Sequence, residues 1–255
     1  MRKTSLFLFS VPLIWGCSAG PLAVDLSARV GASPTTAGAQ LEQRLEVANG
    51  VTLERVRVLV RMMKLEREGQ HDDGTPDTNG GDANAAGGDG EIELEAGPFL
   101  VDLSGAALDG SQVVKFTQLT VEPGMYDELE FKVAKISADE VGGKADLAEM
   151  QQNQATVIID GKIDGQSFRF LSGLEVEQKR EIRFEVSEDN GNITLSLDPR
   201  GWFTNESGGR LDPRQSDARS TLETNIKRSI DAFDDEDHDG GEDHDNDGDE
   251  DDTQQ

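Results

Sequence analysis

Residues 113–137 read VVKFTQLTVEPGMYDELEFKVAKIS and carry the clearest fold signal in the chain. Pro-Gly favours a turn, because Pro fixes φ and Gly accepts a positive φ. Alternating apolar runs on both sides of this turn predict an antiparallel hairpin. The apolar positions are Val114, Phe116, Leu119 and Val121 before Pro123-Gly124, and Leu129, Phe131 and Val133 after it.

Similar runs lie on both sides of this segment. Residues 156–173 alternate around Asp164-Gly165, and residues 181–203 alternate around Asn190-Gly191, a strong hairpin signal. Residues 22–30 also alternate and predict a half-buried strand. Eight to ten short strands with regularly spaced turns predict a mainly β fold, an antiparallel β-sandwich of the prealbumin or immunoglobulin type.

Residues 50–66 are long enough for a helix, but their β-branched content favours a strand. Val51 and Leu53 are out of phase with Val56, Val58 and Val60, which predicts a bulge.

Two kinds of segment flank or interrupt these strands. Residues 143–152 and the amphipathic run within 204–233 predict helices, the second with Leu222, Ile226, Ile230 and Phe233 on one stripe. We expect residues 68–91 to be a disordered Gly/Asp-rich insertion and residues 234–255 a disordered acidic tail, because neither holds a periodic apolar pattern. The sandwich domain is therefore expected over 17–67 and 92–203.

The charge balance excludes several functions. The chain has 51 acidic and 24 basic residues, for a formal net charge of -27. A basic face is needed to bind phosphates, so we expect no nucleic-acid partner. Electrostatic docking on anionic lipid is disfavoured for the same reason.

The N-terminus predicts export. Residues 1–16 read MRKTSLFLFSVPLIWG, a positive start and a short apolar run typical of a signal peptide. Ile14 to Cys17 resembles the bacterial lipobox, from which Trp15 departs, and Cys17 is the one Cys of the chain. We expect Cys17 to carry a lipid, with Ser18 favouring the outer membrane, facing the periplasm or the cell surface. The alternative is an ordinary signal peptide cleaved a few residues later.

The tail holds two Asp-x-Asp-x-Asp-Gly runs, which resemble the calcium loops of EF-hands, dockerins and thrombospondin type 3 repeats. Asn246 and Gln254 stand where the EF-hand pattern needs its bidentate Glu, so we expect weak calcium binding. The alternative is a solubilising tail without a defined ion. The candidate ligands are Asp235, Asp237, Asp239, Asp243, Asp245 and Asp247.

Catalytic patterns are scarce. His71, His238 and His244 all lie outside the strand-like segments, so no positioned base is expected and the chain is predicted not to be an enzyme. The alternative is a glycoside hydrolase that uses a carboxylate pair. Its candidates are Asp102, Asp160, Asp164 and Asp198, for which a turn role is the simpler reading.

Two aromatic residues offer a binding hypothesis. Trp202 follows a strand-like run and Tyr126 lies beside the Pro-Gly turn. Either ring could stack on a sugar, whereas the alternative is a structural role in the sandwich.

Three runs resemble a family of uncharacterised bacterial lipoproteins: GPFLVDLSG, LTVEPGMYDELEFKV and IDGQSFRFLSG. The resemblance covers roughly residues 20–203 and implies a prealbumin-like β-sandwich domain of unknown function. Together with the residues, it predicts a non-enzymatic, membrane-anchored module that binds carbohydrate or an envelope protein. A third possibility is envelope assembly by β-strand addition, for which a long unpaired edge would be the sign.

Overall fold

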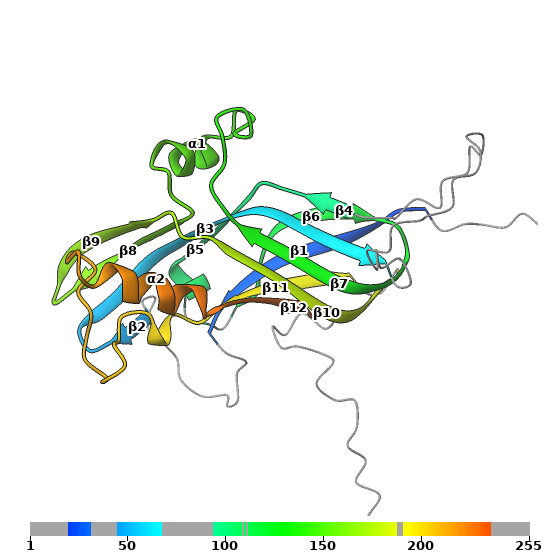
Figure 1. Cartoon of the computed structure of the whole chain (residues 1–255). Coiled ribbons are helices and arrows are strands. Elements are labelled where there is room, and N and C mark those ends of the chain that lie inside the picture. The colour runs from blue at the N-terminus through cyan, green and yellow to red at the C-terminus, as the bar shows by residue number, and fades with distance from the viewer. Residues whose placement is uncertain are drawn as a thin grey trace, which may run out of the picture.

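The computed structural model describes residues 20–31, 45–67, 94–108, 110, 112–187 and 191–235 (Figure 1). The fold is a β-sandwich with two α-helices, α1 (Ala145–Gln152) and α2 (Arg219–Lys227), and two short 3-10 helices, η1 (Gly105–Leu108) and η2 (Pro199–Gly201). The strands are β1 (Leu22–Val30), β2 (Leu45–Ala48), β3 (Val51–Arg67), β4 (Leu94–Ala96), β5 (Phe99–Ser104), β6 (Val114–Val121), β7 (Gly124–Val133), β8 (Val157–Ile163), β9 (Gln166–Ser172), β10 (Val176–Val186), β11 (Asn192–Leu197) and β12 (Ile230–Asp234).

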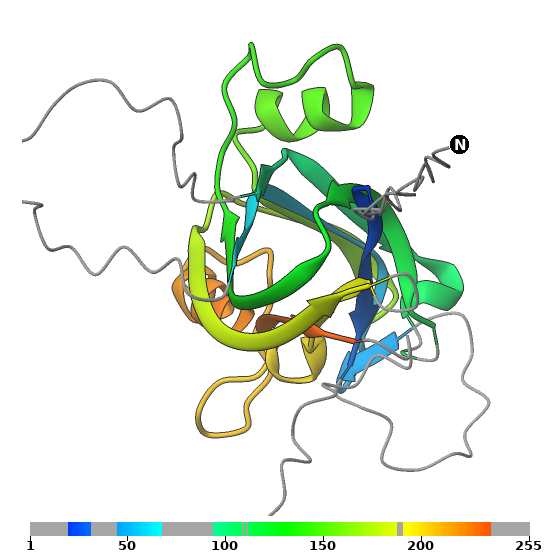
Figure 2. The same ribbon diagram turned by 90° about the vertical axis from the view of Figure 1, so that its right-hand side faces the viewer.

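The strands form two sheets, which face each other in Figure 2. The four-stranded sheet has the order β12-β11-β1-β6, and the eight-stranded sheet is built on β3, in the order β10-β7-β3-β8-β9 with β2, β4 and β5 also paired to β3. All the strand pairs are antiparallel except β1 with β11, which are parallel. The expected sandwich is therefore confirmed, with one parallel pair that the sequence analysis did not foresee.

The apolar faces of the two sheets enclose the main core, which includes Val24, Leu26, Val58, Phe131 and Phe184. A second, smaller cluster lies where α1 packs against the other face of the eight-stranded sheet. Its buried members are Leu59, Ile136, Leu147, Met150, Ala155 and Ile158.

Several local predictions are confirmed. Residues 51–67 form a strand, and its register against β8 shifts between Leu53 and Arg55, as the change of phase predicted. Asp164 and Gly165 both have positive φ and join β8 to β9 in a tight hairpin. Leu65 pairs with Leu94, so the 68–91 insertion does connect two antiparallel strands.

Two predicted hairpins are wrong. The segments around Pro123-Gly124 form strands, but β6 pairs with β1 whereas β7 pairs with β3 and β10. Likewise β10 pairs with β7, whereas β11 lies between β1 and β12. Both turns therefore carry the chain from one sheet to the other. The alternating pattern predicts which face of a strand is buried, and the same pattern fits either sheet.

The C-terminal helix is shorter than predicted. α2 ends at Lys227, and Ile230 and Phe233 lie on β12, which pairs with β11. Backbone N–H and C=O groups of residues 230–234 form hydrogen bonds with β11, whereas in a longer helix they would have bonded within the helix. Asp234 thus belongs to the sandwich rather than to the tail. Among the described residues, neither helix has the length and apolar content to cross a bilayer.

Candidate binding groove beside α2

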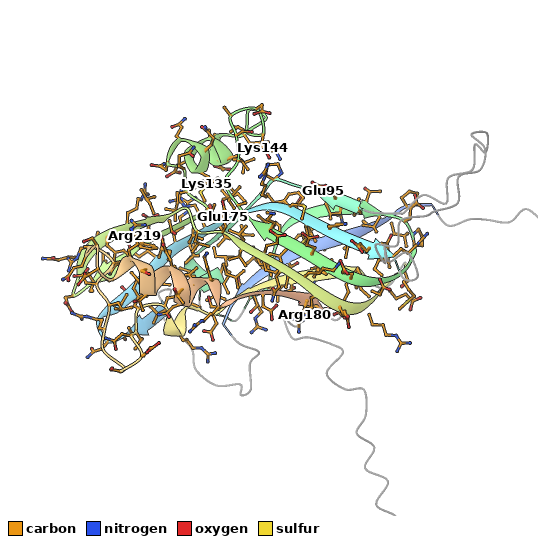
Figure 3. The ribbon with its side chains drawn as sticks, viewed as in Figure 1. Glu95, Lys135, Lys144, Glu175, Arg180 and Arg219 are labelled. Atoms are coloured by element: carbon orange, nitrogen blue, oxygen red, sulfur yellow. The ribbon has the colours of Figure 1, made fainter. Side chains whose placement is uncertain are left out.

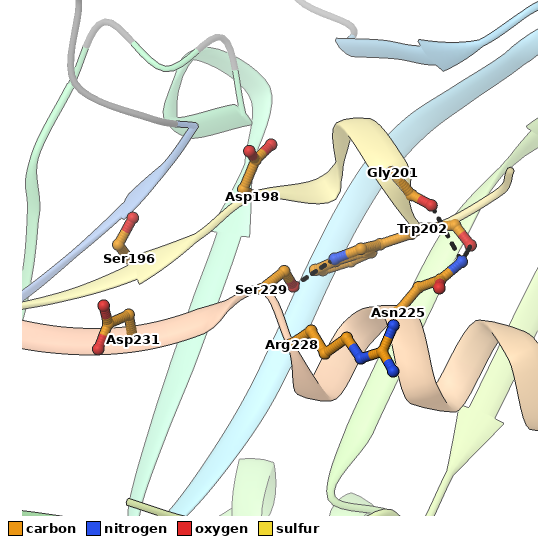
Figure 4. Close-up of a pocket in the computed structure, with 8 residues that line it drawn as sticks. All are labelled: Ser196, Asp198, Gly201, Trp202, Asn225, Arg228, Ser229 and Asp231. Atoms are coloured by element: carbon orange, nitrogen blue, oxygen red, sulfur yellow. Dashed lines mark hydrogen bonds between the residues drawn. The ribbon is translucent and has the colours of Figure 1, made fainter. Parts of the chain in front are cut away.

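A groove of about 380 Å³ opens where β11 ends and the chain passes through η2 into α2 and β12 (Figure 4). Leu222 and Ile226 bury one stripe of α2 in the main core, which fixes the helix against the sandwich. The groove residues come from all four elements and their connections. They are Ser196, Asp198, Gly201, Trp202, Asn225, Arg228, Ser229 and Asp231.

Trp202 forms the floor of this groove. Its side chain is 1% exposed, and its Nε1 donates a hydrogen bond of 2.5 Å to Ser229 Oγ. Ser229 Oγ donates in turn to the carbonyl of Ile226, at the end of α2. Tyr126 is fully buried and donates its hydroxyl to the carbonyl of Glu122. Neither ring is exposed to solvent, so neither can stack on a sugar. Both Trp202 and Tyr126 have a structural role in the sandwich instead.

Asn225 fixes the wall of the groove. Its Nδ2 lies within 2.9–3.1 Å of the carbonyl oxygens of Gly201, Trp202 and Thr204 and donates to them. One amide group of α2 thus holds three carbonyl groups at the end of η2 and just after it. Its Oδ1 makes no hydrogen bond within the described part of the chain, so it remains free to accept one from a ligand.

The charged groups of the groove differ in their partners. Asp198 accepts from the Nε and backbone N of Arg200, which lowers the pKa of the Asp198 carboxyl. Asp231 accepts from Arg180 of β10 at 3.0 Å. The exposed guanidinium of Arg228 makes no ion pair or hydrogen bond with the described residues. Arg228 is therefore the cation that this groove offers to a ligand.

A repeated tetrapeptide builds this end of the molecule. Leu-Asp-Pro-Arg occurs at 197–200 and again at 211–214. In both copies Asp Oδ1 accepts from the Arg backbone N, at 3.1 and 3.0 Å, and Asp Oδ2 accepts from the Arg guanidinium, at 2.6 and 2.7 Å. A search for short internal repeats would have found this motif, which the strand periodicity hides.

The four carboxylates considered for hydrolysis do not form a pair. Each is bound by arginine instead: Asp102 and Asp160 lie on the strands that flank β3, whereas Asp164 and Asp198 lie in turns. The pKa of Asp164 is lowered by Arg210, and that of Asp198 by Arg200. A glycosidase acid needs a raised pKa, so Asp164 and Asp198 are poorly suited to that role. The pairs are Asp102 with Arg55, Asp160 with Arg57 and Arg169, Asp164 with Arg210, and Asp198 with Arg200.

Asp235 is the one candidate calcium ligand that the structure describes. It is fully buried, and its Oδ2 accepts from Thr194 Oγ1 at 2.6 Å and from Asn192 Nδ2 at 3.2 Å. Its carboxylate is thus bound to β11 rather than presented to an ion. Within the described ranges, no three His, Cys, Asp or Glu side chains are arranged to hold a metal ion. The other predicted ligands lie outside the described residues, as do Cys17, His71, His238 and His244.

The comparisons with known proteins add little to these observations. No family of proteins and no curated protein matches the sequence. Among solved structures, the chain is similar to MbnP from Methylosinus trichosporium, at 13% identity and a TM-score of 0.34. The match covers 72% of this chain and 76% of that one. A likeness at this level carries no argument about function, which has to come from the site itself.

Proposed function

We propose that this protein is a lipid-anchored, non-enzymatic module of the cell envelope, which binds carbohydrate in the groove beside α2. The observation that carries the proposal is the placement of the groove relative to the expected lipid. Leu22, the first residue of β1, follows Cys17 by five residues, a reach of about 17 Å. The groove lies at the other end of that strand.

The parallel pairing of β1 with β11 supports this polarity. Val30, at the end of β1, is the register partner of Leu197, just before Asp198 and η2. The nine residues of β1 span about 26 Å between their first and last Cα atoms. A lipid on Cys17 would therefore hold the start of β1 near the membrane and direct the groove away from it. In Figure 1, α2 lies toward one end of the sandwich and β4 toward the other.

The lining of the groove favours a ligand rich in hydroxyl groups. Arg228 offers donors, while Asn225 Oδ1 offers an acceptor on a rigid wall. Planar polar groups of this kind can each contact two neighbouring hydroxyls. Trp202 is covered, so binding would rest on hydrogen bonds rather than on stacking. Weak calcium binding by the rest of the tail, beyond Asp235, is a secondary part of the proposal.

The groove is tested with a glycan array on the detergent-solubilised full chain, followed by calorimetry on the best glycan. Arg228→Ala should weaken binding at least tenfold. Lys227→Ala removes the neighbouring exposed cation, which does not line the groove, and should leave the affinity unchanged. An equal loss of affinity in both variants would indicate nonspecific charge attraction. If the protein bound no glycan on the array, carbohydrate binding would be refuted.

The anchor is tested separately by fractionation of cells that express Cys17→Ser. We expect the variant to move from the membrane fraction to the soluble exported fraction. Unchanged partitioning would refute the lipid anchor and leave the groove result standing.

A further inference from the structure

Four strands end the two sheet orders, β12 and β6 in one sheet and β10 and β9 in the other, and three of these outer strands are protected against pairing with another strand. β2, β4 and β5 also pair on one side only, with β3. α2 reaches β9 through Arg219, labelled in Figure 3, which donates to the carbonyl of Leu171 at 2.8 Å. β10 alternates charged residues along its exposed face, and Arg180 reaches from it to Asp231 and to the carbonyl of Ala232 on β12. Charges and covering groups of this kind are the usual defence of an edge strand.

The fourth outer strand, β6, lacks this protection. Within the described chain it pairs on one side only, with β1. Its single charge, Lys115, is bound to Asp25 at 2.6 Å. The eight residues of β6 thus present about 23 Å of backbone edge whose N–H and C=O groups have no partner strand among the described residues.

A furrow of about 370 Å³, lined by both polar and apolar groups, lies beside this edge, between β5, β6 and the start of α1. It lies at the seam between the two hydrophobic clusters of the molecule. Phe99 and Phe116 pack against the main core, with ring centroids 6.2 Å apart, whereas Leu100 and Leu147 belong to the cluster under α1. A guest in the furrow would bury partly exposed apolar surface of both clusters at once.

We propose that this furrow binds an extended peptide segment of a partner protein, which adds to the free edge of β6 as a strand. The open backbone edge requires an extended occupant, because only a strand satisfies successive N–H and C=O groups. The apolar side chains in the furrow, among them Phe99, Phe116 and Leu147, favour alternate apolar side chains on that segment. The rim carries one cation, Lys144, and one anion, Asp146, neither of them paired with a described residue, so an uncharged segment fits best.

A synthetic copy of residues 113–122, VVKFTQLTVE, provides a defined probe. We consider antiparallel pairing with β6 in which the Phe of the peptide lies opposite Leu119. Its second Val then lies opposite Val121 and its Lys opposite Thr120, so no like charges meet. The experiment titrates the fluorescently labelled peptide with the detergent-solubilised full chain and follows anisotropy. Saturable binding below about 1 mM is expected. Absence of saturation in that range would overturn the proposal.

Two test variants, one control variant and one N-methylated control peptide locate the binding. Phe116→Arg on β6 and Leu100→Arg on β5 should each weaken binding at least tenfold, whereas Ile182→Arg, at a partly buried position on the protected edge β10, should not. Circular dichroism identifies any variant that fails to fold. A peptide with alternate N-methylated amides should lose binding, because it keeps the side chains and loses the donors.

Each alternative gives a different result. Equal binding of the N-methylated peptide would show capture of side chains without strand addition, and equal loss in Ile182→Arg would place the peptide elsewhere. A scrambled peptide that binds as tightly would indicate unspecific apolar adhesion. Any of these outcomes overturns the proposal and leaves the groove beside α2 unaffected.

Discussion

The two α-helices are attached to the sandwich in different ways. α2 inserts Leu222 and Ile226 into the main core, and its Asn225 clamps the chain after η2. α1 stands out from the sandwich in Figure 1 and has its own small apolar cluster. Its Glu149 accepts from Arg57 at 2.6 Å, and Arg57 is 2% exposed. One helix is thus part of the main core, and the other is attached through a small apolar cluster of its own and through ion pairs.

This difference bears on the two surfaces proposed to bind ligands. The groove beside α2 is lined by groups that the core holds in place, which favours a preformed site. The furrow beside β6 has α1 as one wall, and that wall depends on a local cluster and on ion pairs. We therefore expect the furrow to adjust to its guest and the groove to remain fixed. The predictions that follow test this contrast.

The largest effect is expected from Leu222→Ala compared with Leu147→Ala. Truncating Leu222 leaves a cavity in the main core and should lower the free energy of global unfolding by about 2–5 kcal/mol. Leu147 lies in the second cluster, so its truncation should mainly increase amide exchange within residues 137–155. Chemical denaturation and hydrogen exchange measure the two effects. Equal global losses would show that α1 belongs to the same cooperative unit as α2.

A smaller effect is expected from Arg57→Met. Arg57 Nη2 lies 2.9 Å from Asp160 Oδ2, and its Nη1 contacts Glu149 on α1. Arg169 also contacts Asp160, so that carboxylate keeps a partner after the substitution. The cost should be about 1–2 kcal/mol, with loss of protection in α1. Arg55→Met removes the exposed partner of Asp102 and should change stability by less than about 0.5 kcal/mol. If the two variants were equally stable, the ion pairs would not hold α1.

The smallest effect is expected from the repeated Leu-Asp-Pro-Arg turns. The arginine in each turn lowers the pKa of Asp198 and Asp212 in the folded state. Such groups stabilise the fold above their unfolded pKa of about 3.9, and that contribution is lost as the pH falls through the lower folded value. The melting temperature of Asp198→Asn should therefore fall less steeply below about pH 4 than that of the wild type. The expected contribution of Asp198 is below about 1 kcal/mol because the pair is exposed. If the melting temperature of Asp198→Asn fell as steeply with decreasing pH as that of the wild type, the Asp198–Arg200 pair would be excluded as a cause of the acid destabilisation.

The sequence allowed the strands to be predicted better than their partners. The alternation in 51–67 predicted β3 and its bulge, because a change of phase is visible along one segment. The Asn190-Gly191 signal failed because β11 is buried on both sides and needs two neighbours, which β1 and β12 provide. Strand pairing of this kind depends on residues more than 150 positions away, and no local pattern contains it.

The groove shows the same limit. Trp202 and Asp198 were candidates because of their residue types. The hydrogen bond of the buried indole to Ser229 and the pairing of Asp198 with Arg200 do not follow from composition. Asn225 and Arg228 look like ordinary polar positions of an amphipathic helix. Their roles arise because α2 ends beside η2, so that only the packed structure brings them together.

The parallel pair of β1 and β11 also has a consequence for assembly. β1 cannot occupy its place between β6 and β11 until residues 192–197 are present, about 170 positions later in the chain. Contacts across such a separation slow folding, because a long loop must close before they form. The first strand to be synthesised is thus among the last to gain both its neighbours. A chain held at its N-terminus would complete its sandwich by closing the C-terminal half onto the anchored strand.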